Sequence, residues 1–211
     1  MIAPAVVGRR VHIVGPLSAA ASSFEEIYAL DDPHWARVAF DAAQLLQRAV
    51  AARGTVDLDD VARVASAQPG WGVSERYTPT LSQERDKTGE MIVRVQTALH
   101  AYIGAPLQGR QREQFNATIA YAFVNLATQR GSDWLQFERA TAGTRYRYHL
   151  LFALQNPATG STLCLAPVVL HVGVDRDAER AQLLTLKDDV ALDVRIDALK
   201  LYLPRLHAPS V

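Results

Sequence analysis

The segment 162–174 is apolar on both of its faces, and this constrains the fold more than any other feature of the 211-residue chain. Its length and its flanking turns indicate a β-strand. Antiparallel strands usually alternate apolar and polar residues, because one face of the sheet meets water. Here both faces need a cover. The apolar residues are Leu163, Cys164, Leu165, Ala166, Val168, Val169, Leu170 and Val172.

Three more strands are predicted around this one. An alternating pattern predicts a strand over 145–154, with charged residues on one side and aromatic residues on the other. Further strands are expected over 180–188 and 193–203, and the short turns between them favour an antiparallel sheet. In the last strand the apolar positions change phase near Ala198. This change predicts a β-bulge, a twist or burial of both faces.

The first half of the chain is predicted to be helical, because its apolar residues recur at helical spacing. One stripe covers 33–50 and follows Asp32, a favourable N-cap, with proline in the first turn. A shorter helix is expected over 23–30. Two further stripes, over 91–103 and 115–126, are joined by a short linker that contains Gly and Pro. They predict an antiparallel helical hairpin.

Two groups of helices can therefore cover the two faces of one sheet. The predicted fold class is α/β of the α+β type: a three-layer α-β-α sandwich, with an antiparallel sheet flanked by two layers of helices. The sequence has no internal repeat and no linker rich in Pro, Gly or Ser. We expect a single domain over 1–211, with its core over about 11–204.

Composition excludes several classes of function. The 22 Lys and Arg residues balance the 22 Asp and Glu residues, so the chain lacks the excess of positive charge that nucleic acid or an anionic membrane attracts. The six histidines are scattered, and the single Cys164 allows no internal disulfide and no cysteine cluster for a metal. The sequence contains no P-loop and no nucleophile elbow. We therefore expect no enzyme activity, no cofactor and no metal.

Two further observations concern the surface and the chain start. Arg145 and Arg147 lie on one side of a predicted strand, where they fit a solvated edge or, alternatively, a lipid headgroup site. The N-terminal apolar stretch is too short for a secretory signal, and its basic pair follows it. No run approaches the roughly 18 apolar residues of a membrane-spanning helix. We expect a protein made in soluble form, without a recognisable signal peptide.

Several short motifs resemble those of one protein family. The stretch 146–160, YRYHLLFALQNPATG, resembles the Tyr-x-Tyr strand, the Leu-Phe-Ala-(Ile/Leu)-Gln-Asn stretch and the Thr-Gly turn of the Cyt family of cytolytic δ-endotoxins. The likeness continues through 180–186 and 194–200, and upstream through 30–33 and 123–129. The resemblance implies a six-stranded antiparallel sheet between two helix layers. This agrees with the sandwich predicted from the residues.

The resemblance also implies a membrane-active toxin that binds phospholipid bilayers and permeabilises them. A protein with buried apolar faces can enter a bilayer only when these faces are buried again in lipid, so the helical hairpin must undock from the sheet. The residues then expected to contact lipid are Met91, Ile92, Val95, Leu99, Tyr102, Ile103, Phe115, Ile119, Phe123 and Leu126. The candidate pore-strand residues are Tyr146, Tyr148, Leu150, Phe152, Leu163, Leu165, Val168 and Leu170.

Strands with free edges are unstable in lipid, so a spanning form is expected to be an oligomer closed on itself. A detergent-like action of amphipathic helices is the alternative. Before membrane contact we expect a soluble monomer or dimer, and the active form is expected outside the producing cell or at the target-cell membrane. Cys164 is a candidate acylation site. Two other functions stay open: a non-lytic virulence or interaction module of the same fold, and a carrier of an apolar ligand between the sheet and the helices.

Overall fold

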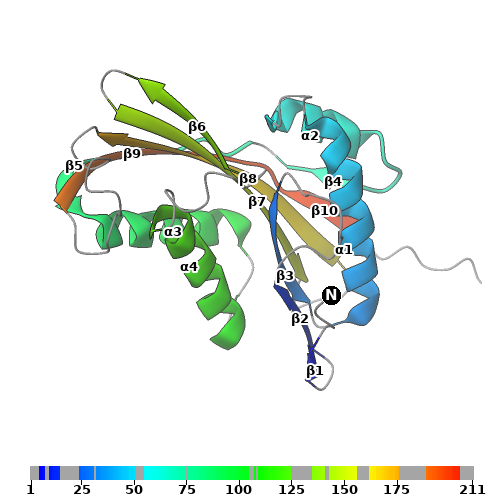
Figure 1. Cartoon of the computed structure of the whole chain (residues 1–211). Helices are drawn as coiled ribbons and strands as arrows, with labels where there is room; N and C mark the ends of the chain where they lie inside the picture. The colour runs from blue at the N-terminus through cyan, green and yellow to red at the C-terminus, as the bar shows by residue number, and fades with distance from the viewer. Residues whose placement is uncertain are drawn as a thin grey trace, which may run out of the picture.

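The apolar segment forms strand β8, Thr162–Asp175, in the middle of the sheet. β8 pairs antiparallel with β7, Gly143–Gln155, along one edge. Along its other edge it pairs with β9, Asp189–Ala198, and β10, Leu201–Pro204 (Figure 1). Residues 163–170 are all buried, so both faces of the strand are covered, as predicted. The computed structural model describes residues 5–7, 10–14, 24–30, 32–50, 55–74, 76–104, 107, 109–124, 135–140, 143–155, 162–175 and 189–204.

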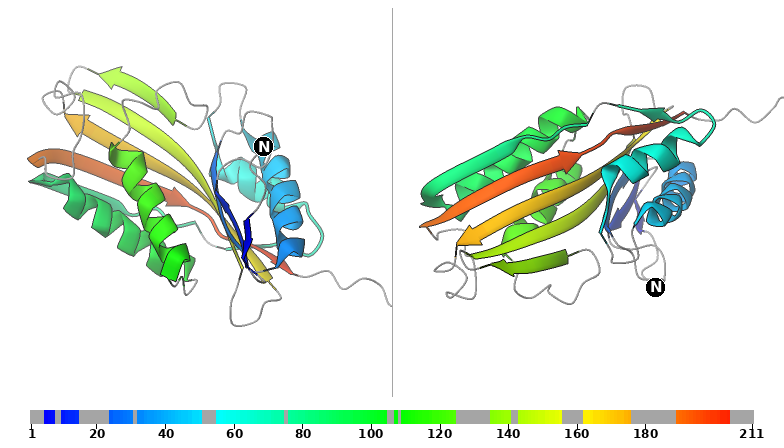
Figure 2. Two further views of the ribbon diagram at one scale, coloured as in Figure 1. Left: turned by 60° about the horizontal axis from the view of Figure 1, so that its bottom comes forward. Right: turned by 90° about the horizontal axis from the view of Figure 1, so that it is seen from above.

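Shorter strands complete the sheet at both edges (Figure 2). They are β1 Ala5–Val7, β2 Arg10–Val14, β3 Glu25–Leu30, β4 Gly72–Val73, β5 Thr80–Lys87 and β6 Leu135–Ala140. β3 and β6 pair with different halves of the same edge of β7, while β5 pairs with β9 and β4 with β10. The sheet is antiparallel except at one pair, because β3 runs parallel to β7.

The phase change near Ala198 is a break between two strands. β9 ends at Ala198 and β10 begins at Leu201, while the Leu199 backbone N–H donates to the Pro167 carbonyl at 3.1 Å. Before the break, the even-numbered apolar residues of β9 pack on one face of the sheet. After it, the odd-numbered residues pack on the other. Asp193 and Arg195 of β9 and Tyr202 of β10 are exposed, so the interruption of the strand, and not burial of both faces along it, accounts for the change of phase.

The predicted helix over 23–30 is wrong. This segment is strand β3, which pairs with β2 on one side and with β7 on the other. Its local pattern is compatible with a helical turn. However, a strand that pairs on both edges satisfies its backbone donors and acceptors through distant partners, and this tertiary pairing overrides the local pattern.

Other differences concern segments that the sequence left unassigned. The structure contains a short helix that was not predicted, α2, Leu58–Ser66. It also contains the strand β5, which leads directly into the helix that follows it. The predicted strand over 180–188 lies outside the described residues. Edge strands and short helices carry weak local signals, because few of their positions face a core.

One helical layer is formed by α1, Pro33–Leu46, with the 3₁₀ turn Gln47–Ala49 and α2. The helix α1 begins as predicted: the Asp32 carboxylate accepts the His34 N–H at 2.9 Å, which caps the first turn. The Asp32 N–H also donates to Gln155 Oε1 at 3.0 Å, and this bond ties the start of the helix to the end of β7. The buried residues of α1, the 3₁₀ turn and α2 form one apolar cluster with residues of β8 and β10.

The other layer is formed by α3, Thr88–Ile103, and α4, Gly109–Val124. α3 ends at Gly104 in the left-handed conformation, with φ 66°, and its N–H donates to the His100 carbonyl at 3.0 Å. The two helices pack together as predicted, although their axes are visibly inclined to each other (Figure 1). They cover the face of the sheet opposite α1 and α2.

The sheet therefore lies between two helical layers, and the predicted three-layer sandwich is confirmed. The two layers are offset. α1 and α2 lie over the end that carries β3, β4 and β10, whereas α3 and α4 lie below the part that carries β5 and β9 (Figures 1 and 2). Part of the sheet face on the α1 side consequently has no described helix over it.

Candidate functional site

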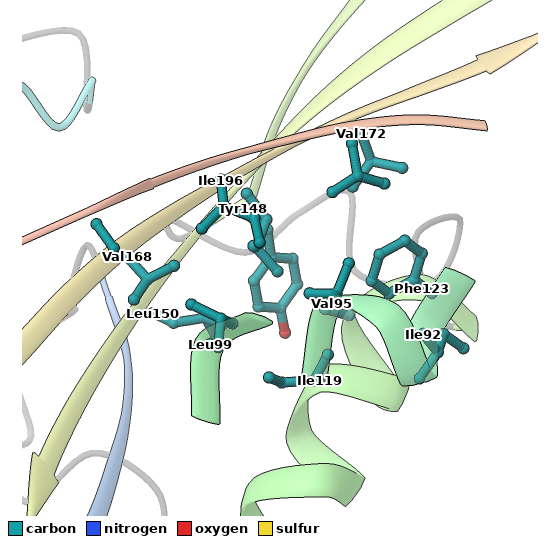
Figure 3. Packing of buried hydrophobic residues seen from close by; sticks show 14 of the residues in the cluster. Ile92, Val95, Leu99, Ile119, Phe123, Tyr148, Leu150, Val168, Val172 and Ile196 are labelled. Carbon is teal, nitrogen blue, oxygen red and sulfur yellow. The ribbon is translucent and has the colours of Figure 1, made fainter. Parts of the chain in front are cut away.

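The interface between α3, α4 and the sheet contains the residues predicted to contact lipid. All of those on the two helices that the structure describes are buried, except for the half-buried Tyr102. Figure 3 shows how Val95, Leu99 and Ile119 point toward strand residues such as Tyr148 and Leu150. The buried set is Met91, Ile92, Val95, Leu99, Ile103, Phe115, Ile119 and Phe123. Leu126 lies outside the described residues.

The predicted pore-strand residues are divided between the two faces of the sheet. Six of them belong to the cluster beneath α3 and α4: Tyr146, Tyr148, Leu150, Phe152, Val168 and Leu170. Leu163 and Leu165 belong instead to the cluster beneath α1 and α2. Removal of α3 and α4 would thus expose the first six residues but not the last two. All eight were predicted as one set because both strands are apolar in sequence, and the sequence does not show which face each residue shares.

The C-terminal end of α3 is fixed to the sheet through Tyr102. Its ring stacks on Tyr77, with centroids 4.5 Å apart and planes 7° from parallel. Its hydroxyl lies 3.3 Å from Ser74 Oγ, and the Lys200 ammonium lies 4.8 Å from the ring centroid. Burial raises the pKa of the Tyr102 phenol above its ordinary value. The sequence analysis named only Tyr102, because its partners come from distant strands and loops.

Two further polar contacts hold α3. Arg94 Nη1 donates to the Ser82 carbonyl of β5 at 3.0 Å, and Gln96 Nε2 donates to the Asn116 carbonyl of α4 at 2.8 Å. Both contacts are accessible to water or only partly buried. Exposed or half-exposed polar contacts exchange readily for bonds to water. Apolar burial is therefore the main attachment of this layer to the sheet.

The free Cys164 is buried in β8. Desolvation raises the pKa of its thiol to about 11, against the opposing charge of Lys200. The thiol is therefore protonated at neutral pH and is a weak nucleophile. Acylation at Cys164 stays a prediction, and it would require this strand to be opened first.

A network around Asp197 lies on the same face of the sheet as α1 and α2, next to the part that no described helix covers. Asp197 Oδ2 accepts from Arg195 Nη2 at 2.5 Å and lies 3.1 Å from His171 Nε2. Arg76 Nη2 is 3.7 Å from the same oxygen. Burial lowers the pKa of His171, although the Asp197 carboxylate acts in the opposite direction. This network is not visible in the sequence, because it depends on the pairing of β8 with β9.

The sequence model of the family described as "Bacillus thuringiensis toxin" matches residues 3–208 of this chain. The chain belongs to this toxin family. It is similar to the type-1Aa cytolytic delta-endotoxin of Bacillus thuringiensis subsp. morrisoni, with 29% identity over 186 residues, which cover 83% of this chain and 74% of that protein. The type-1Ba cytolytic delta-endotoxin of subsp. neoleoensis is 32% identical over 145 residues, 68% of this chain and 55% of that protein.

Two solved structures of the toxin family share the fold. The activated Cyt2Ba monomer from Bacillus thuringiensis subsp. israelensis has a TM-score of 0.78 and 20% identity, and the match covers 89% of this chain and 100% of that chain. A delta-endotoxin structure has a TM-score of 0.82 and 22% identity, with coverage of 100% and 94%. The resemblance to cytolytic δ-endotoxins noted from the sequence motifs is therefore confirmed.

Two structural features of the described residues bear on the chemistry of this toxin-family chain. No described helix is long and apolar enough to cross a membrane. No group of three or more His, Cys, Asp or Glu side chains among the described residues is placed to hold a metal ion. The apolar interface between the α3–α4 layer and the sheet contains the buried residues predicted to contact lipid, and it is the candidate site.

Proposed function

We propose that this chain is a membrane-active cytolysin that binds phospholipid bilayers and permeabilises them when α3 and α4 leave the sheet. Membership of a cytolytic toxin family supports the general activity. The observation that carries the mechanism is the apolar interface itself, in which both helices bury one face on strands that are buried along most of their length.

The energetics of apolar burial favour this movement at a membrane rather than in water. Full burial of one large apolar side chain contributes about 1.5–3 kcal/mol. Burial of the eight residues named above therefore contributes about 12–24 kcal/mol, which is as large as or larger than a typical total stability of about 5–15 kcal/mol. In water, undocking would leave these side chains exposed at this cost. At a bilayer the same faces meet acyl chains, which offsets the loss.

The strands beneath the helices are long enough for the proposed end state. β7 has 13 residues and β8 has 14, whereas a tilted strand crosses a bilayer with about 9–11. Strand edges left unpaired in lipid would cost several kcal/mol for each polar group. The proposed spanning form is therefore an oligomer closed on itself. A detergent-like action of the helices is the alternative within the same proposal.

Two other functions compete with this one. A non-lytic virulence or interaction module of the same fold would bury the same interface but never open it. A carrier would need an apolar cavity between the sheet and one helical layer. The hollow that the structure describes on the uncovered face is lined mainly by polar and charged side chains, so it does not supply such a cavity. The cytolysin is therefore the function we propose first.

Dye leakage from phosphatidylcholine vesicles tests the proposal. A Cys164→Ala background receives a cysteine pair between α3 and β9, placed where the Cβ atoms are about 3.5–4.5 Å apart. We expect no leakage from the oxidised protein and full leakage after reduction. A matched pair between α1 and β8 ties down the other layer. This second tether should leave leakage unchanged in both redox states.

Each outcome has a separate meaning. If the untethered protein neither binds the vesicles nor releases dye at micromolar concentration, the cytolysin function is wrong. If the oxidised α3–β9 tether still permits leakage, the protein is lytic but the undocking of α3 is wrong. If the α1–β8 tether blocks leakage equally, the movement is not confined to the α3–α4 layer.

A further inference from the structure

The uncovered part of the sheet contains a hollow of about 530 Å³. It opens on the face opposite α3 and α4, near β5, β6 and β9, where Figure 1 draws no helix. Its volume lies within the range of about 300–1,000 Å³ that is typical of small-ligand pockets. The residues that line it are Thr80, Gln136, Glu138, Arg145, Tyr146, Arg147, His171, Val172, Gly173, Asp193 and Arg195.

Strand register aligns the polar residues of this hollow in rows across the sheet. One row is Gln136 on β6, Arg147 on β7, His171 on β8, Arg195 on β9 and Thr80 on β5. Directly opposed residues lie about 4.5–5.5 Å apart on one face of an antiparallel sheet, close enough for their side chains to act on one ligand. Five segments distant in sequence thus contribute to a single polar surface.

The second row gives the hollow its depth. It runs from Glu138 through Arg145 and Gly173 to Asp193. Gly173 has no side chain, so the floor of the hollow lies at the backbone of β8. A Cβ atom built at Gly173 would lie 3.6 Å from Asp193 Cβ, an ordinary van der Waals contact. Glycine is therefore not required by packing at this position, and its effect is to leave space.

Two arginines in the hollow, Arg145 and Arg147, have no ion pair within the part of the chain that the structure describes. Arg195 donates to the buried Asp197 carboxylate. In contrast, no side-chain hydrogen bond or ion pair within the described residues involves Arg145 or Arg147, and both residues are exposed. The cross-strand neighbours of Arg147 are Gln136 and His171, neither of which is a carboxylate, whereas Arg145 lies opposite Glu138 without forming an ion pair with it. Two guanidinium groups are therefore available to a ligand.

We propose that this hollow binds a phosphate group through Arg145 and Arg147. The planar guanidinium donates two parallel N–H bonds to the oxygens of a phosphate, which makes arginine well suited to this ligand. Glu138 and Asp193 lie in the same row as Arg145 and repel further negative charge. This arrangement favours a single phosphate ester over a polyanion.

The proposed function supplies a source for this phosphate, and this part of the inference rests on it. A phospholipid headgroup carries one phosphate at the bilayer surface. Its capture would place the uncovered polar face of the sheet against the membrane while α3 and α4 are still docked on the opposite face. The headgroup site thus defines the orientation of the first contact, before any apolar surface is exposed.

Two probes distinguish the lipid from free phosphate. Inorganic phosphate is titrated into ¹⁵N-labelled full-length protein, and the arginine Nε–Hε NMR signals report occupancy. Sedimentation with phosphatidylcholine vesicles reports membrane binding. We expect the double variant Arg145→Gln/Arg147→Gln to weaken both by at least tenfold. The control Arg37→Gln removes an exposed arginine from α1 and should change neither by more than about twofold.

A second variant tests the hollow without altering charge. Gly173→Val places a branched side chain on the floor, in a strand where valine is favourable. We expect weaker phosphate and vesicle binding, with a melting temperature close to that of the unaltered protein. The melting temperature of the arginine double variant provides the same check on folding, because both arginines are exposed and unpaired within the described residues.

The outcomes separate this inference from the proposed function. If inorganic phosphate leaves the Arg145 and Arg147 signals unmoved, or binds the double variant as tightly as the unaltered protein, the phosphate site is wrong. If the double variant loses phosphate but keeps vesicle binding, the headgroup assignment is wrong. If phosphate binds as proposed while the unaltered protein binds no vesicles, the site is supported and the membrane function fails.

Discussion

The two faces of the central strands differ in how far their apolar surface extends. On the face beneath α3 and α4, β7 is apolar from Tyr146 to Leu154, and β8 and β9 continue the same cluster. On the opposite face, β7 changes from Arg145 and Arg147 at one end to Leu151 and Ala153 at the other. The helices α1 and α2 cover only this second, apolar end. Helix coverage thus follows the apolar surface on each face.

This difference assigns different roles to the two helical layers. The α3–α4 layer conceals an apolar face that spans most of the sheet, so its removal would create a large lipid-compatible surface. The α1–α2 layer conceals a smaller one and leaves a polar hollow beside it. Substitutions in either layer should therefore lower stability, but only those in the α3–α4 layer should also alter membrane activity.

The largest expected effect tests this separation directly. Leu99 on α3 and Leu46 on α1 are both fully buried, and Leu→Ala at either site should cost about 2–5 kcal/mol of unfolding free energy. Only Leu99→Ala should also accelerate dye leakage, because it weakens the layer that moves. Urea unfolding and stopped-flow leakage provide the two measurements.

The control for these variants is Val93→Ala, on the same helix as Leu99 but 58% exposed. It should change stability by no more than about 0.5 kcal/mol. Equal acceleration of leakage by Leu46→Ala and Leu99→Ala would contradict the unequal roles of the two layers.

A smaller effect is expected next to the uncovered part of the sheet. Asp197→Asn removes the buried negative charge that faces Arg195, His171 and Arg76. Loss of its charge-assisted hydrogen bonds should cost about 1–3 kcal/mol, measured by urea unfolding. Asp41→Asn, at an exposed ion pair with Arg37, should cost at most about 0.5 kcal/mol. Similar costs for both variants would show that the Asp197 network adds no stability of its own.

A still smaller loss of stability is expected when the contact between the end of α3 and the sheet is weakened. Tyr102→Phe keeps the ring stack on Tyr77 but removes the hydroxyl near Ser74 and the Ala198 carbonyl. We expect a loss of about 0.5–1.5 kcal/mol and a modest increase in leakage rate. Tyr121→Phe, on the exposed side of α4, is the matched control. An unchanged leakage rate with reduced stability would mean that this contact does not limit undocking.

The smallest expected effect is a pH dependence. Because burial lowers the pKa of His171, the unfolded chain binds this proton more readily than the folded protein does. Stability should therefore be complete above the ordinary histidine pKa of about 6.5 and fall as the pH drops below it toward the lowered folded value. His171→Gln should flatten the urea-unfolding free energy between pH 7.5 and 5. An unchanged slope would exclude His171 as the cause.

The sequence alone was sufficient for the elements with strong periodicity. The doubly apolar stretch of β8 required two covers, and the stripes of α1, α3 and α4 supplied them, so the three layers followed from local patterns. Such a pattern depends on the spacing of apolar residues along the chain, so it can be recognised from neighbouring residues alone. The family was likewise indicated by contiguous motifs around 146–160 and confirmed by comparison.

Tertiary structure alone decided which residues share a site. The helix predicted over 23–30 is a strand because β2 and β7 pair with it. The same limit applies to the contact of Tyr102 with Tyr77, and to the row that joins Arg147 to His171. Each depends on strand register or on docking between distant segments. Local sequence determines that a strand forms and which face is apolar, but only the pairing of the whole sheet sets which side chains meet across it.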